Sequence, residues 1–175
     1  MKIQNPIFLV SVRFGTVAAG VCMILFTVLY YSGRNPMVIP AFLDFRLLLF
    51  PIFLVFGIRD FRENRNNGYL HFWQGFSVGM LIVLIVAVVM GFYIYFLGSL
   101  LDPGFTSHYI HTTMDNIVNA RDRIIAQVGE KAYRESLRLV PTTTLFDLSL
   151  DYFIKSLPPG IILTILISLV LRRNQ

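Results

Sequence analysis

Long apolar runs alternate with short charged segments along the chain, and the longest runs predict membrane-spanning helices. Residues 14–33 carry no charge over 20 positions and are bounded by Arg13 and Arg34. Residues 72–101 contain no Asp, Glu, Lys, Arg or His over 30 positions. A helix needs about 20 mostly apolar residues to cross the hydrocarbon core of a bilayer. Both segments therefore predict spans, and the second is long enough to tilt or protrude.

A cleaved signal peptide is the competing interpretation of the first apolar run. The run is longer than a usual signal core, and Tyr30-Tyr31-Ser32-Gly33 offers no good small-x-small cleavage site. We therefore expect a retained helix, preceded by a short interfacial lead-in over residues 2–13.

A second span over residues 40–58 is predicted with interruptions. The segment is long enough only if Asp44 and Arg46 are included, and Pro51 lies near its middle. A proline inside a membrane helix removes one backbone donor and commonly produces a kink. We expect a kinked helix followed by a charged loop over residues 59–68, which contains an Asn-Gly turn.

A polar segment, residues 105–142, precedes the last span, which is predicted over residues 145–171. Apolar residues recur in this segment at three- and four-residue spacings and predict an amphipathic helix. They are Ile110, Met114, Ile117, Ile124 and Val128. We expect this helical insert to be broken near Gly129 and to resume to about Leu139.

The composition supports one membrane domain over residues 1–175 and excludes several soluble classes. The chain is 55% hydrophobic and 14% charged, with a mean hydropathy of +0.66. The single Cys22 cannot form an internal disulfide, and the surplus of 15 Lys and Arg over 10 Asp and Glu fits membrane topology better than nucleic-acid binding. The predicted fold is all-α, with four transmembrane helices and an extracytoplasmic amphipathic insert between the third and fourth.

The density of positive charge predicts the orientation of these spans. Three arginines lie within residues 59–68, Arg172 and Arg173 follow the last span, and Lys2 and Arg13 flank the first. Four spans place all three groups on one side, which the positive-inside rule assigns to the cytoplasm. We therefore expect both termini in the cytoplasm and residues 105–142 outside.

Five ionisable residues are predicted to gather near the outer interface. Their spacing by four places three of them on one helical face, and the other two enter the second span from the same side. They are Asp147, Asp151 and Lys155, with Asp44 and Arg46. Such a cluster is either a polar site for an ion, a proton or a lipid head group, or a set of pairs that fix helix packing. We favour the packing interpretation.

His108, His111 and Asp115 share a helical face and are of residue types that bind zinc. The spacing supplies no fourth ligand and no HExxH motif, so we prefer solvated residues at a helix start. We expect no metal site and no cofactor. No nucleophile elbow, Walker loop or Cys-His pair supports enzymatic chemistry.

Gly75 and Gly79 form a small-xxx-small pair, with Gln74 and Ser77 nearby for interhelical hydrogen bonds. The pair predicts close helix packing. It leaves open whether the partner is another span, a second copy or a different protein.

The junction between the second and third spans has a distinctive sequence. Residues 57–62 read GIRDFR, residues 67–76 read NGYLHFWQGF, and Gly79 follows. This junction resembles that of the small four-helix membrane proteins of Bacteroidota classed as domain-of-unknown-function family 4199. The end of the third span, the polar insert and the basic C-terminus are also similar.

Two features depart from that family: the insert is less acidic, and the last span carries Asp147, Asp151, Lys155 and Pro158-Pro159. The resemblance implies four spans and the bacterial inner membrane, but no activity. It also implies a place in envelope glycan or lipid machinery, because such genes often lie near glycosyltransferases that act on polyprenyl-phosphate carriers.

These observations together predict a non-enzymatic inner-membrane protein that serves as an accessory or partner subunit. The alternative is a small transporter or flippase-like protein that uses the outer polar cluster. The expected partners are the lipid bilayer and either another protein or a second copy of the chain, with no nucleic acid.

Overall fold

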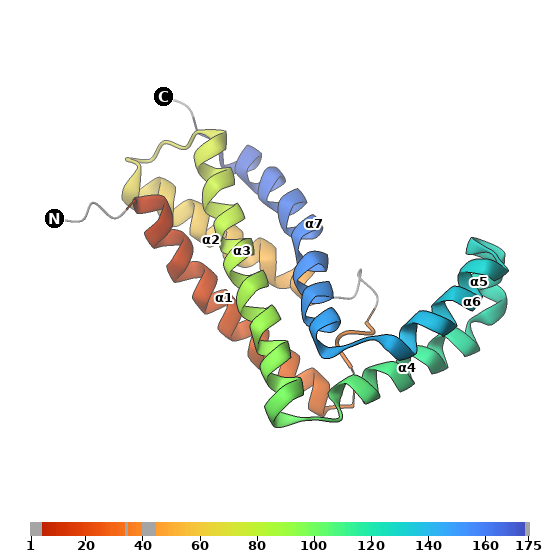
Figure 1. Ribbon diagram of the computed structural model, residues 1–175. Coiled ribbons are helices and arrows are strands. Elements are labelled where there is room, and N and C mark those ends of the chain that lie inside the picture. Colours follow the sequence, from red (N-terminus) through yellow and green to blue (C-terminus); the bar gives the residue numbers. More distant parts are fainter. Residues whose placement is uncertain (1–4, 34, 40–44, 174–175) are drawn as a thin grey trace.

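The chain is almost entirely helical over residues 5–33, 35–39 and 45–173, the part that this computed structural model describes. Long helices pack side by side, and shorter ones form an arm at one end (Figure 1). The long helices are α1 (Pro6–Tyr31), α2 (Arg46–Arg65), α3 (Phe72–Phe96), which continues as a π-helix (Leu97–Leu101), and α7 (Leu145–Leu171). The arm comprises α4 (Phe105–Asn119), α5 (Arg121–Val128), α6 (Glu130–Leu139) and a 3-10 turn (Val140–Thr142).

Three of the long helices are long and apolar enough to cross a membrane. They are α1, α7, and α3 together with its π-helical extension. The predicted second span is the exception, since α2 begins at Arg46 and residues 40–44 lie outside the described residues. Between Arg46 and Arg59, α2 has only 12 uncharged residues, about 18 Å of helix against about 30 Å of hydrocarbon. Three of the four predicted spans are thus helices long and apolar enough to cross a membrane, and the weaker second span corresponds to the shorter α2 within the described residues.

Two helices extend beyond their predicted bounds, each through local hydrogen bonds. The expected lead-in belongs to α1, because the Asn5 side chain accepts from the Ile7 amide (3.1 Å) and Pro6 occupies the first turn. The first part of the expected charged loop continues α2, where Asn64 donates to Asp60 four residues earlier (2.8 Å). The Asn-Gly turn is present: Asn67 and Gly68 both have positive φ, at 52° and 83°.

Among the described helices, α3 and α7 share the most extensive contact, a seam that contains three glycines. A Cβ built on Gly75 would lie 3.1 Å from Oγ of Ser168, and one on Gly79 only 2.7 Å from Cγ2 of Thr164. The third glycine of the seam is on the other helix, where Gly160 of α7 lies against Val83 of α3. Small residues at these positions let the two backbones approach. The partner of the Gly75 and Gly79 motif is thus α7 of the same chain.

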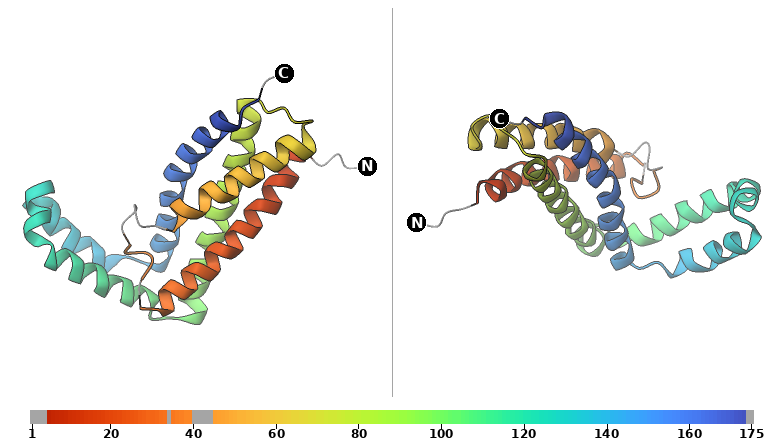
Figure 2. Two further views of the ribbon diagram at one scale, coloured as in Figure 1. Left: turned by 180° about the vertical axis from the view of Figure 1, so that it is seen from behind. Right: turned by 90° about the horizontal axis from the view of Figure 1, so that it is seen from above.

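The arm leaves the bundle at the end opposite the termini. Figures 1 and 2 show α4, α5 and α6 extending away from the long helices, while the start of α1 and the end of α7 lie toward the opposite end of the bundle. The predicted break at Gly129 is confirmed, since its φ of 86° ends α5 and lets α6 fold back.

An isolated antiparallel β-bridge joins the residues beyond α7 to the turn before α3. In this bridge, Arg173 and Leu70 exchange two backbone hydrogen bonds of 2.9 and 3.1 Å.

Candidate functional site

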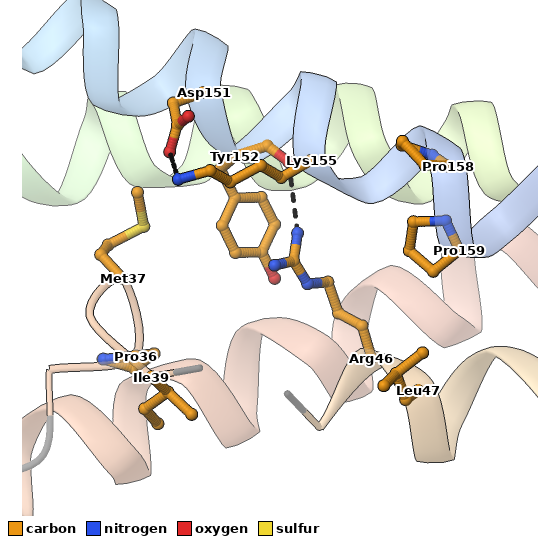
Figure 3. Close-up of a pocket in the computed structure, with 10 residues that line it drawn as sticks. All are labelled: Pro36, Met37, Ile39, Arg46, Leu47, Asp151, Tyr152, Lys155, Pro158 and Pro159. Atoms are coloured by element: carbon orange, nitrogen blue, oxygen red, sulfur yellow. Dashed lines mark hydrogen bonds and ion pairs between the residues drawn. The ribbon is translucent and has the colours of Figure 1, made fainter. Parts of the chain in front are cut away.

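A pocket of about 510 Å³ opens between the beginning of α2 and the first half of α7 (Figure 3). Residues 36–39 of the segment that follows α1 form its third wall. The polar side chains that line it belong to Arg46, Asp151, Tyr152 and Lys155, and Leu47 and Pro159 are among its apolar lining residues. We call it the Arg46 pocket.

The pocket exists because α2 begins part of the way along α7. Nη1 of Arg46 donates to Oγ of Ser156 (2.7 Å) and to the backbone oxygen of Tyr152 (3.3 Å). Ser156 is eleven residues beyond the first residue of α7, or about 16 Å along the helix axis. Along that part of α7, the described residues beside the pocket include Pro36, Met37 and Ile39.

The guanidinium of Arg46 is held in one orientation by the surrounding groups. Arg46 is only 9% exposed, and its Cζ lies 4.2 Å from the ring centroid of Tyr152, a cation–π contact. Ser156 accepts from Arg46 and donates in turn to the Tyr152 carbonyl (2.7 Å). A charge at this depth is costly unless it is paired or hydrogen-bonded, and these contacts meet that requirement.

An ion pair lies beside the guanidinium on the same helix. Nζ of Lys155 is 2.6 Å from Oδ2 of Asp151, one helical turn earlier, and both side chains are more exposed than Arg46. Figure 3 shows this pair and the Tyr152 ring on the face of α7 that lines the pocket. The structure thus brings together the acid and the lysine that their four-residue spacing placed on one face.

Two consecutive prolines in α7 add unusual backbone chemistry to the wall of the pocket. Pro158 and Pro159 both line it and remain inside a continuous helix. A proline nitrogen carries no hydrogen, so the carbonyls of Ile154 and Lys155 receive no bond from the residues four positions later. Backbone acceptors of this kind are tolerated at membrane depth where they line a cavity.

Three of the five residues predicted to form the outer polar cluster therefore line one pocket: Arg46, Asp151 and Lys155. Asp147 caps the start of α7 instead, accepting from the backbone nitrogen (2.8 Å) and hydroxyl (2.6 Å) of Thr144. Asp44 lies outside the described residues. Sequence reasoning missed Tyr152 and Ser156. The sequence indicates only that an arginine within an apolar segment, such as Arg46, requires hydrogen-bond acceptors. It does not indicate which helix supplies these acceptors.

The weak metal candidates lie on the arm. His108, His111 and Asp115 are exposed on α4. Within residues 5–33, 35–39 and 45–173, no three His, Cys, Asp or Glu side chains form a group that could hold a metal ion.

Gln74 acts at the α2–α3 turn. Its Oε1 accepts from the backbone nitrogen of His71 (3.0 Å) and from Nδ2 of Asn66 (3.0 Å). The Asn66 side chain also donates to the Tyr69 carbonyl (2.7 Å). Gln74 therefore fixes the start of α3, while Gly75 and Gly79 make the contacts with α7.

A second pocket, of about 520 Å³, lies between α3 and α7 on the other side of α7. It is lined mainly by aromatic side chains, among them Phe92, Tyr95, Phe146 and Phe153, with Gly91 at the α3 wall. None of its lining residues is charged. Its polar lining side chains are the hydroxyls of Tyr95 and Ser149, and its mainly apolar character matches the lipid-facing surface of a membrane helix pair.

Comparison with known proteins assigns the family. The model of the family described as "Protein of unknown function (DUF4199)" matches residues 13–173 of the chain. The chain therefore belongs to this family. No curated protein and no solved structure matches it.

Proposed function

We propose that this DUF4199 protein is a non-enzymatic accessory subunit of envelope glycan or lipid machinery in the bacterial inner membrane. The observation that carries the proposal is the arm, which extends from the bundle instead of packing over it (Figure 2). α5 contains no buried residue, and in α6 only Tyr133 is buried. An arm that buries so little of itself gains stability from a partner that covers it.

The surface of the arm suits a polar partner interface. Two ion pairs lie along α6, between Glu130 and Arg134 (2.6 Å) and between Glu135 and Arg138 (2.7 Å). Apolar side chains are exposed beside them, including Val128 and Leu139. Alternating charge with interspersed apolar groups provides specificity through charge complementarity, together with area to bury.

The opposite end of the bundle supports the proposed orientation. The end of α2, whose last turn contains Arg62 and Arg65, lies there with the end of α7 and the start of α1 (Figure 1). Arg62 joins the ends of α2 and α7, since its Nη1 donates to the Leu171 carbonyl (3.3 Å). Basic residues in short connections favour the cytoplasmic side, so both termini are assigned to the cytoplasm and the arm to the outside.

A small transporter or flippase-like protein is the second candidate, and the Arg46 pocket is the observation that favours it. A transporter needs a polar path that continues past the bilayer midplane. Below the pocket, α7 presents Gly160, Thr164 and Ser168 to α3, and all three are buried in the tight seam. This packing favours the accessory role over transport.

The test is purification from native membranes in a mild detergent, with co-purifying proteins identified by mass spectrometry. The informative variant exchanges one ion pair of the arm, Glu130→Arg with Arg134→Glu, which keeps a pair on the helix but reverses the surface charge. The matched control makes the same exchange at the cytoplasmic end, Arg59→Glu with Glu63→Arg, where the parent pair is 2.9 Å apart.

We expect a stoichiometric partner from envelope glycan or lipid synthesis to purify with the parent and the control but not with the arm variant. A parent protein that purifies without a partner would contradict the accessory role. Retention of the partner by the arm variant would contradict the role of the arm.

A further inference from the structure

We propose that the Arg46 pocket binds the head group of a phospholipid, specifically a phosphodiester whose alcohol carries a hydrogen-bond donor, such as a glycerol or ethanolamine group. The proposal concerns a ligand site on the bundle. It does not depend on whether the arm has a protein partner.

The positively charged side chains of the pocket are of types that bind phosphate groups. Among the described lining residues, Arg46 and Lys155 are positive and Asp151 is negative. A guanidinium carries five N–H donors in a rigid planar fork, a geometry that matches phosphate oxygens. A phosphate oxygen would join the contacts that the Arg46 guanidinium already makes, among them the hydrogen bond to Ser156. The cation–π contact with Tyr152 holds the fork in place before a ligand arrives.

The depth of the pocket fits a lipid head group. Ser156, which marks the level of Arg46, is 15 residues before Leu171, or about 22 Å along α7. If Arg172 and Arg173 mark the cytoplasmic interface of a hydrocarbon core about 30 Å thick, the Arg46 guanidinium lies in the outer third of that core, about 8 Å inside its boundary. Lys155 lies one residue closer to the outer end of α7 and is exposed, so its long cationic side chain can extend from this level toward the lipid phosphates.

The walls of the pocket fit an amphiphile better than a free ion. Leu47, Met37, Ile39 and the two prolines supply apolar surface around the charged groups. Ligand sites for amphiphilic molecules combine mainly apolar walls with a few placed polar groups. A small hydrated anion gains nothing from such walls, whereas the glycerol and upper acyl region of a lipid does.

The acceptors explain the choice of alcohol. Lys155 lines the pocket, and its carbonyl lacks the helical bond from residue 159 because Pro159 has no N–H. Together with the Asp151 carboxylate, this carbonyl can accept from hydroxyl or ammonium hydrogens. A choline head group has no such hydrogen and leaves these acceptors unmatched.

The experiment measures lipid retention by native mass spectrometry on the full-length protein in a neutral detergent. Phosphatidylglycerol and phosphatidylethanolamine are the probes, with phosphatidylcholine for comparison. The key variant is Leu47→Trp, which fills the pocket from a lining position, and its matched control is Leu48→Trp on the same helix. Leu48 is 68% exposed and does not line the pocket. Both changes avoid Arg46, whose loss endangers the contact between α2 and α7.

We expect the parent and Leu48→Trp to retain phosphatidylglycerol at least about tenfold more tightly than phosphatidylcholine, and Leu47→Trp to lose that preference. Equal retention of the two lipids by the parent, or equal retention by the two tryptophan variants, would overturn the proposal. In a final competition measurement, glycerol phosphate or inorganic phosphate is added at millimolar concentration to the lipid-bound protein. Displacement of the lipid by either would show an anion site and not a lipid site.

Discussion

Arg46 donates a 2.7 Å hydrogen bond to Ser156, and sixteen residues later Arg62 donates one of 3.3 Å to the carbonyl of Leu171. Ser156 and Leu171 are fifteen residues apart on α7, nearly the same separation as that of the two arginines on α2. The two helices therefore run in the same direction, and the contacts are separated by about the same length on each. Two arginines thus fasten the shorter helix to the longer one at both ends. The register between α2 and α7 sets the level on α7 at which α2 begins, and this level sets the position of the Arg46 pocket.

The hydrogen bond between Arg62 and the Leu171 carbonyl predicts unequal effects of two arginine substitutions. Arg62→Met removes the donor to Leu171 from a side chain that is only 18% exposed, and we expect a loss of about 1–2 kcal/mol in the free energy of unfolding. Arg65→Met changes an exposed side chain three residues later and should cost less than about 0.5 kcal/mol. Thermal melting in detergent measures both. Equal losses would show that the contact with Leu171 contributes nothing.

The α3–α7 seam predicts a difference between two glycines of α3. Gly79→Leu should destabilise the protein by more than about 2 kcal/mol, because a Cβ there lies 2.7 Å from Thr164 within a closed seam. Gly91→Leu should cost much less, since its Cβ meets nothing closer than the Ser149 carbonyl at 3.5 Å and its side chain enters the apolar groove. Detergent melting compares them. A similar loss in both variants would remove the special role of Gly79.

The ion pair beside the Arg46 pocket predicts non-additive substitutions. Asp151→Asn or Lys155→Met alone leaves one charge of a 2.6 Å pair without its partner, while the double variant removes both. We expect the double variant to lose less stability than the sum of the single variants, by about 0.2–1 kcal/mol.

Complementation of a deletion strain separates structure from function at the same pair. If the pair serves packing, the double variant should complement. A double variant as stable as the parent that fails to complement would show that the carboxylate or the amine is needed beyond packing. That outcome favours the transporter candidate.

The positions of the arm and of the α2–α3 turn predict opposite labelling patterns. After replacement of Cys22, a cysteine at position 120 should react with a membrane-impermeant reagent added from outside. A cysteine at position 67 should react only after the cytoplasmic side is opened. The reason is that these positions lie at opposite ends of the bundle (Figure 1). Labelling of position 120 only from the cytoplasmic side would contradict the proposed orientation.

The ion pair at the start of α6 predicts a local pH response at Glu130. The hydrogen bond from the Arg134 guanidinium lowers the pKa of this carboxyl below its ordinary value. A depressed pKa contributes stability above the unfolded pKa, and this contribution is lost as the pH falls through the lower folded value. Arg134→Gln should therefore raise the Glu130 pKa, as measured by NMR titration of the carboxyl carbon. Arg138→Gln, which removes the partner of Glu135, should leave it unchanged.

Local patterns determined most of the helices. Uncharged length alone predicted most of α1 and all of α3 with its extension, because a run of about 20 apolar residues is long enough to cross the hydrocarbon core as a helix. The break at Gly129 and the Asn67–Gly68 turn followed from backbone preferences that act within a few residues. The contact between Asp151 and Lys155 followed from helical periodicity, since both residues belong to one helix.

Only the tertiary structure decided where α2 begins relative to α7, which small residues of α7 face Gly75 and Gly79, and that Arg46 is held by Tyr152 and Ser156. The sequence placed Arg46 and Asp147 near one interface, yet one lines the pocket and the other caps a helix. The physical reason is that periodicity specifies a face within a helix but not the register between two helices. That register is set by side chains more than a hundred residues apart, through packing that no local pattern records.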